Sequence, residues 1–219
     1  MEIILNTMVH QRGGIPCDIT FRDKIAHNNI LIIDKEAKIK RLRVEFLCNN
    51  SVIRIGKCSS GQFTIQTGED CVISIGNGVT CTGNVTIFTA EGTSVSIGND
   101  VMFSTGVNIK THDHHPIFDI STGKRINISE NIIIEDHVWI SEQVYIGKGT
   151  IIKSGSMIGF RSFVKGYIPN NCIAVGTPAK VIKKNIAWER PLLNWAEPFY
   201  KPDCSCLKKS NYWNFTKEQ

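Results

Sequence analysis

Long apolar runs are missing from this 219-residue chain. No stretch approaches the about 18 consecutive apolar residues that indicate a membrane-spanning helix. The first residues, MEIILNTMVHQRGG, include a short apolar patch but lack the basic leader and small-residue cleavage site of a secretory signal. We therefore expect a cytoplasmic, soluble protein without a transmembrane segment.

A strong excess of charge is missing as well. The net charge is +5, and the basic residues are spread along the chain apart from two short lysine-rich segments. This balance does not require a nucleic-acid partner, and we expect none. The eight cysteines are scattered and form no C-x-x-C motif. We therefore expect reduced thiols rather than a disulfide framework.

The dominant feature of the sequence is a repeat of six residues. Between 134 and 164 an aliphatic residue returns at every sixth position: Ile134, Ile140, Ile146, Ile152, Ile158 and Val164. An α-helix turns through about 600° in six residues, so these positions would not share one helical face. A single amphipathic strand has period two. The repeat therefore predicts short strands joined by sharp bends, stacked as parallel coils around an aliphatic interior.

The phase of the repeat divides the chain into three segments. Residues 1–50 alternate like strands but without the six-residue phase, which predicts irregular N-terminal coils or a capping layer. Residues 51–182 are expected to form the repeat solenoid. Residues 183–219 are rich in Lys, Trp, Tyr and Pro, and we expect a C-terminal cap or an arm, because the open end of a solenoid must be covered.

One interruption, near 110–133, breaks the repeat. Ile134 follows Ile109 by 25 positions, a spacing that is not a multiple of six, so the chain must leave the coils and return as an excursion loop. Long excursions from rigid scaffolds often carry function. This loop begins with His112, His114 and His115. A further histidine, His137, follows the loop and is expected to face outward from its coil.

Three phrases around the loop resemble the catalytic segment of a known family: HHPIFD, GKRIN and IIIEDHVWIS. They are similar to those of hexapeptide-repeat acetyltransferases, in particular bacterial capsular-polysaccharide and polysialic acid O-acetyltransferases. The resemblance implies an all-β, left-handed parallel β-helix and a homotrimer with active sites between subunits. It also implies acetyl transfer to a sugar hydroxyl of a capsular or other cell-surface polysaccharide, sialic acid included, and no metal is expected.

The resemblance also implies roles for two residues. His115 corresponds to the family's catalytic histidine, which directly precedes a proline, and Trp139 to the tryptophan of its H-V-W phrase. A neutral imidazole can take the proton of a hydroxyl as it attacks a thioester, which allows direct transfer. The Trp139 indole or a backbone N–H would stabilise the oxyanion. Asp113 or a loop carbonyl would orient the imidazole.

The phrase IAVGTPAKVIKK, beginning at Ile173, resembles the closing motif of the family, whose final coil borders the coenzyme A groove. Acetyl-CoA is therefore the implied acetyl donor. Small residues would leave room for the pantetheine arm, and lysines would reach the phosphates. The implied cofactor-binding residues are Ser141, Gly159, Lys165, Gly176, Thr177, Ala179, Lys180 and Lys183.

Three alternatives remain at this point. The first is an amino-sugar or small-molecule N- or O-acetyltransferase of the same fold. The second is a γ-type carbonic anhydrase, but the adjacent His114 and His115 do not resemble its dispersed zinc ligands. The third is a solenoid used only as a binding surface, which the presence of both His115 and Trp139 disfavours.

Overall fold

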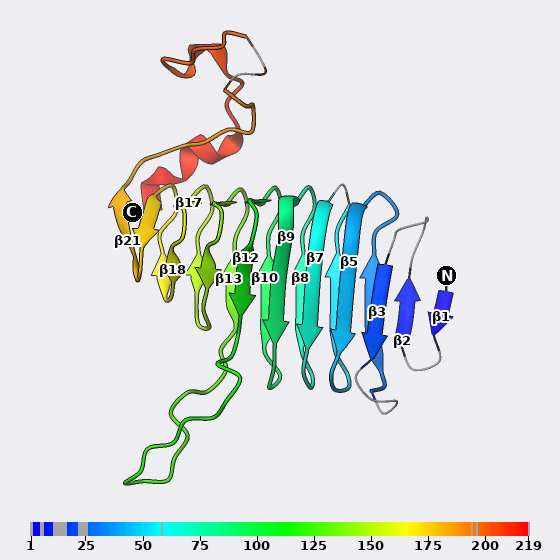
Figure 1. Cartoon of the computed structure of the whole chain (residues 1–219). Coiled ribbons are helices and arrows are strands. Elements are labelled where there is room, and N and C mark those ends of the chain that lie inside the picture. Colours follow the sequence, from blue (N-terminus) through cyan, green and yellow to red (C-terminus); the bar gives the residue numbers. More distant parts are fainter. Residues whose placement is uncertain are drawn as a thin grey trace.

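The computed structural model describes residues 2–4, 7–10, 17–21, 26–57, 59–193, 195 and 197–218. Within these residues the chain forms a solenoid of stacked β-strands without an α-helix (Figure 1). The expected all-β β-helix is therefore confirmed. None of the helices in the described part is long and apolar enough to cross a membrane.

Two sheets form the walls of the solenoid in the described residues. The first sheet has nine strands, in the spatial order β1 (Glu2–Ile4), β2 (Thr7–His10), β4 (Asn29–Ile33), β6 (Val52–Ile55), β8 (Val72–Ile75), β10 (Ser94–Ile97), β13 (Ile132–Ile134), β16 (Ile151–Ile152) and β19 (Tyr167–Ile168). The second sheet has twelve, which in chain order are β3 (Cys17–Phe21), β5 (Lys38–Phe46), β7 (Ser60–Thr67), β9 (Thr80–Thr89), β11 (Met102–Phe103), β12 (Val107–Lys110), β14 (Trp139–Ile140), β15 (Tyr145–Ile146), β17 (Met157–Ile158), β18 (Phe163–Val164), β20 (Ile173–Gly176) and β21 (Ala179–Lys183).

Successive coils pair in parallel, and the second sheet forks at the long strand β9. The beginning of β9 pairs with β11 and its end pairs with β12. The later coils therefore have three faces, built on the ladders β10–β13–β16, β11–β14–β17 and β12–β15–β18. The expected boundary at residue 51 falls inside this stack, because β4 pairs in parallel with β6 and β5 with β7.

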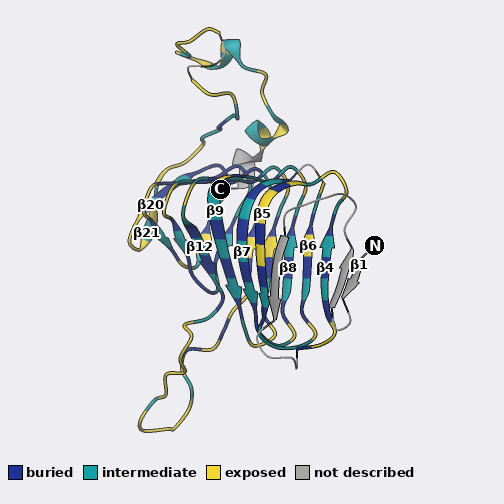
Figure 2. Cartoon of the chain, turned by 45° about the vertical axis from the view of Figure 1, so that its right-hand side comes forward, coloured by how far each residue is buried: buried dark blue, intermediate teal, exposed yellow. Residues whose placement is uncertain are grey.

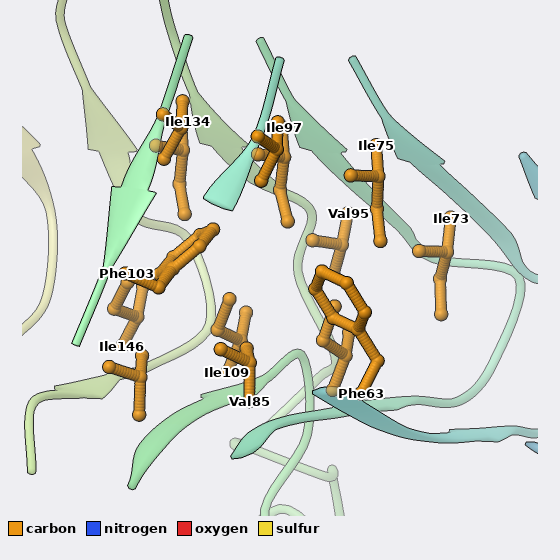
Figure 3. Close-up of a cluster of buried hydrophobic side chains, with 14 of the residues drawn as sticks. Phe63, Ile73, Ile75, Val85, Val95, Ile97, Phe103, Ile109, Ile134 and Ile146 are labelled. Carbon is orange, nitrogen blue, oxygen red and sulfur yellow. The ribbon is translucent and has the colours of Figure 1, made fainter. Parts of the chain in front are cut away.

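The six-residue repeat supplies the interior of the later coils. All six aliphatic positions from Ile134 to Val164 are buried, as are the small or β-branched residues four places after the first five. Upstream coils continue this core with side chains such as Phe63, Ile73 and Phe103 (Figure 3). Full burial of one such side chain contributes about 1.5–3 kcal/mol.

The bends between the short strands have their own six-residue pattern. A residue with positive φ recurs at each of them: His137, Gln143, Gly149, Gly155 and Arg161. This left-handed conformation costs a non-glycine residue roughly 1–2 kcal/mol. The sharp corners of the coil impose the conformation even where the sequence supplies His, Gln or Arg.

Two segments project from the solenoid, the excursion loop between β12 and β13 and a C-terminal arm after β21. Figures 1 and 2 show them leaving on opposite sides, with much of each segment exposed. The arm contains two short 3-10 helices, η1 (Cys204–Cys206) and η2 (Asn211–Glu218). The excursion loop is confirmed, and the C-terminal segment is an arm that returns to pack against the coils.

Candidate active site

The base of the excursion loop is held by Asn127, which is almost fully buried. Its side-chain amide donates to the carboxylate of Asp113 (3.0 Å) and to the backbone carbonyl of His115 (2.9 Å). Its side-chain oxygen accepts from the backbone N–H of Ile117 (2.7 Å). One side chain therefore fixes three loop positions, His115 and the residues two places before and after it.

A second set of contacts ties the loop to the neighbouring coil. Arg125 forms an ion pair with Glu91, which precedes β10 in the neighbouring coil, and Ser129 donates a hydrogen bond to the same carboxylate. The hydrogen bonds from Arg125 and then Ser129 hold the pKa of Glu91 at about 2, against the opposing effect of desolvation. Charge-assisted hydrogen bonds of this kind favour the ionised carboxylate.

His115 is exposed and is positioned through its backbone. Its N–H donates to the carbonyl of Asp113 (2.8 Å), and its carbonyl accepts from Asn127. Within the described residues its imidazole has no hydrogen-bond partner, so the ring is available to a substrate. The carboxylate of Asp113 is instead bound by Lys148 (2.5 Å) and Asn127. In this chain Asp113 holds the backbone of His115 rather than its ring.

The other two loop histidines pack against each other. The ring of His114 lies edge-on to His112 at 4.5 Å and to Phe88 at 6.1 Å. The backbone N–H of His114 donates to Nδ1 of His112 (3.0 Å), which places the proton of a neutral His112 ring on Nε2. Desolvation, followed by the nearby His114 and Lys110, lowers the pKa of His112. This environment favours the neutral form of the His112 ring.

Trp139 lies on a different face of the solenoid from the loop. It belongs to the ladder β11–β14–β17, whereas the loop leaves from the end of β12. Its ring is tilted against Trp188 of the arm, with centroids 6.0 Å apart. In the described part of one chain the structure brings His115 and Trp139 into no direct contact.

The arm is fastened beside Trp139 by an aromatic stack. The ring of His137 lies between Trp188 (4.0 Å) and Tyr212 (4.4 Å), nearly parallel to both. Its Nδ1 lies 2.6 Å from the Asp100 carboxylate, which also binds Arg190 of the arm (2.5 Å). His137 points out of its coil toward the arm, but the arm leaves it only 2% exposed.

The residues expected to bind the cofactor fall into two places. Ser141 and Gly159 stack in successive coils, where the N–H of Ser141 donates to Ile158 and that of Gly159 to Ala174. A Cβ at Gly159 would collide with Val175, so glycine is required there. The remaining members of this group lie on the neighbouring β20–β21 hairpin: Gly176, Thr177, Ala179, Lys180 and Lys183. Lys165 lies apart from them, at the corner where the loop emerges.

At that corner lies a cavity of about 270 Å³, here called the Gly147 cavity. It is lined by Lys110, His112, Asp113, Tyr145, Gly147, Lys148, Phe163 and Lys165. Sequence reasoning missed Asn127, Lys110 and Lys148 as parts of the site. Only the pairing of β12 with β15, across the excursion, reveals that Lys110 and Lys148 lie together.

The described residues contain no group of three or more His, Cys, Asp or Glu side chains that could hold a metal ion. The site presents an exposed imidazole beside a lysine-lined cavity. Such an imidazole can accept a proton from a bound hydroxyl.

Comparison with known proteins supports the same class of fold. No family model matches the chain. The crystal structure of the polySia-specific acetyltransferase NeuO is 34% identical in sequence and superposes with a TM-score of 0.73, covering 88% of this chain and 94% of that one. The structure of the polysialic acid O-acetyltransferase OatWY is 26% identical with a TM-score of 0.59, covering 87% of this chain and 95% of that one.

A curated relative adds a shorter match. The polysialic acid O-acetyltransferase of Escherichia coli O1:K1 / APEC is 40% identical over 84 residues. This match covers 38% of the chain and 27% of that relative's length. The fold and the loop thus define a β-helix of the acyltransferase class. With the extent of the match to NeuO, the chain belongs to the hexapeptide-repeat acetyltransferase family.

Proposed function

We propose that this protein is an acetyl-CoA-dependent O-acetyltransferase that acetylates a sugar hydroxyl of a capsular or other cell-surface polysaccharide containing sialic acid. The observation that carries the proposal is the similarity to the polySia-specific acetyltransferase NeuO over 94% of that chain. The exposed His115 at the rigid base of the loop supports it, because this chemistry needs a base open to substrate.

In the proposed reaction His115 is the general base. Its imidazole takes the proton of the sugar hydroxyl while the hydroxyl oxygen bonds to the thioester carbonyl carbon. The carbonyl oxygen becomes an oxyanion, which the Trp139 indole N–H or a backbone N–H stabilises. The carbon–sulfur bond then breaks, and the proton held by His115 passes to the departing thiolate. No covalent enzyme intermediate is needed.

We infer that the active form is a homotrimer with its sites between subunits. His115 and Trp139 lie on different faces of one chain, so a symmetric assembly is a simple way to bring the two groups together. Acetyl-CoA would lie along the stacked Ser141 and Gly159, with its phosphates near Lys180 and Lys183. We also keep the cytoplasm as the compartment, since the six cysteines whose side chains the structure describes are free thiols.

The test is a thiol-release assay with acetyl-CoA and three acceptors: oligosialic acid, a neutral capsular oligosaccharide and an amino sugar. Mass spectrometry locates the added acetyl group. We expect an alkali-labile acetyl group on an oxygen of oligosialic acid. An acetyl group on nitrogen, or release with none of the acceptors, would refute the proposal.

A further inference from the structure

The Gly147 cavity arises because Gly147 has no side chain in an otherwise continuous row of outward-facing residues. The register of β12 with β15 and of β15 with β18 places Lys110, Gly147 and Lys165 side by side on the outer face. Because Gly147 has only a hydrogen atom there, a gap remains between the two lysines. The rings of Tyr145 and Phe163, 5.6 Å apart, form one wall of this gap.

The charges around the cavity do not balance. Three lysines line it, but it contains a single carboxylate, Asp113, which is bound by the nearly buried ammonium of Lys148. The ammonium of Lys110 lies over the rings of Phe88 (5.1 Å) and Tyr145 (5.8 Å). Neither Lys110 nor Lys165 forms an ion pair within the described residues. These two ammonium groups, which form no ion pair in the described part of the chain, therefore favour a bound anion.

We propose that the Gly147 cavity is a subsite for the carboxylate of one acidic sugar residue of the acceptor, with Lys110 and Lys165 as its ligands. This inference rests on the proposed function, because the acceptor is taken to be a polysaccharide. A volume of about 270 Å³ suits one sugar residue, near the lower limit of ligand pockets. The apolar face of the sugar ring would lie against Tyr145 and Phe163.

The position of the cavity favours the acceptor over the donor. Asp113 lines the cavity and binds the backbone of His115 directly, so the subsite lies beside the proposed base. Ser141 and Gly159, proposed for acetyl-CoA, stack at the preceding corner of the coil, between the faces of β14 and β15. A sugar held by its carboxylate here would present its hydroxyl groups near the loop.

The test measures binding without acetyl-CoA, so that it does not depend on catalysis. Isothermal titration is carried out with oligosialic acid, with its carboxyl-reduced neutral form and with adenosine 3′,5′-diphosphate as a phosphate probe. Lys110→Gln and Lys165→Gln remove one charge each, and Gly147→Ala narrows the gap beside the Phe163 ring. Lys57→Gln, an exposed lysine in a distant coil, is the matched control.

We expect each charge-removing variant to weaken oligosialic acid about tenfold, because hydrogen bonds to charged groups contribute this much. The affinity for adenosine 3′,5′-diphosphate and the thermal midpoint should stay unchanged, and Lys57→Gln should bind oligosialic acid like the wild type. Loss of affinity for adenosine 3′,5′-diphosphate alone would mark a cofactor phosphate site and overturn the proposal. Unchanged binding of oligosialic acid would overturn it too, whereas thiol release with oligosialic acid as the acceptor would still leave the proposed function standing.

Discussion

At the scale of single residues, the excursion loop fixes the backbone of His115 and leaves its imidazole ring exposed. Asn127 and Asp113 hold the two backbone groups of His115, while its imidazole is exposed. A base that must meet a substrate hydroxyl benefits from this arrangement, because its position is set before the substrate binds.

His115→Ala should lower acetyl transfer by about 10²- to 10⁴-fold, the usual contribution of a general base. Acetyl-CoA affinity should change little, because the residues proposed to bind acetyl-CoA lie at another corner of the coil. Steady-state kinetics and equilibrium binding measure the two effects separately. His27→Ala, which removes another exposed histidine, is the control. Equal loss of binding and transfer would show that His115 has a structural role.

The Glu91–Arg125 clamp predicts a pH dependence. The folded-state pKa of Glu91, about 2, lies below its ordinary value of 4.5. The stability that the ionised Glu91 gives the folded state is therefore fully present above pH 4.5 and is lost as the pH falls toward 2. The side chain of Glu91 is 44% exposed, so solvent screening keeps the effect small. The thermal midpoint of wild type minus that of Glu91→Gln should be constant at neutral pH and shrink on acidification; a difference independent of pH would contradict this.

At the scale of elements, the short strands derive their stability from alternate burial. In β13, Ile134 is only 1% exposed, whereas its neighbour Ile133 is 39% exposed. Ile134→Ala should destabilise the fold by about 2–5 kcal/mol, because it leaves a cavity in the core. Ile133→Ala is the matched control and should cost far less. Urea denaturation at one protein concentration compares them, and equal losses would mean that the hexad column is not the core.

The sequence predicts the coils of the solenoid better than it predicts the segments that cover them. The six-residue period identifies the buried positions from Ile134 to Val164 because each coil repeats the same contacts with its neighbours. It says nothing of His137, whose burial comes from Trp188 and Tyr212, distant in sequence and outside the repeat. The parallel pairing of β4 with β6 and of β5 with β7 was likewise hidden, because longer strands in those coils obscure the six-residue phase.

The aromatic stack predicts how the arm is attached. Trp188→Ala removes a ring that packs on His137 and donates to its carbonyl (3.0 Å). We expect the arm to detach and limited proteolysis within it to become faster, while the coils keep their thermal midpoint. Trp195→Ala, at an 83% exposed tryptophan of the same arm, should leave the cleavage rate unchanged. Equal cleavage of wild type and Trp188→Ala would show that the stack does not hold the arm.

At the scale of the whole molecule, one chain presents its candidate groups on separate faces. The sequence motifs predict His115 and Trp139 as a pair, and no structural finding places the two together within a chain. Motifs can name residues but not the neighbouring copy that would complete a site. The Gly147 cavity was beyond sequence reasoning for a related reason, since it is formed by strands on either side of the excursion loop.

Mixed assemblies test whether neighbouring chains share a site. His115→Ala and Trp139→Ala should each be nearly inactive alone, because one lacks the base and the other the proposed oxyanion donor. In a randomly mixed trimer of both, about a quarter of the sites between subunits would combine an intact His115 with an intact Trp139. Unfolding and refolding the two variants together should therefore restore about a quarter of wild-type thiol release, whereas each variant refolded alone should stay inactive. Failure to recover activity, with trimers confirmed by light scattering, would show that the two residues do not form shared sites, and the intersubunit site would be abandoned.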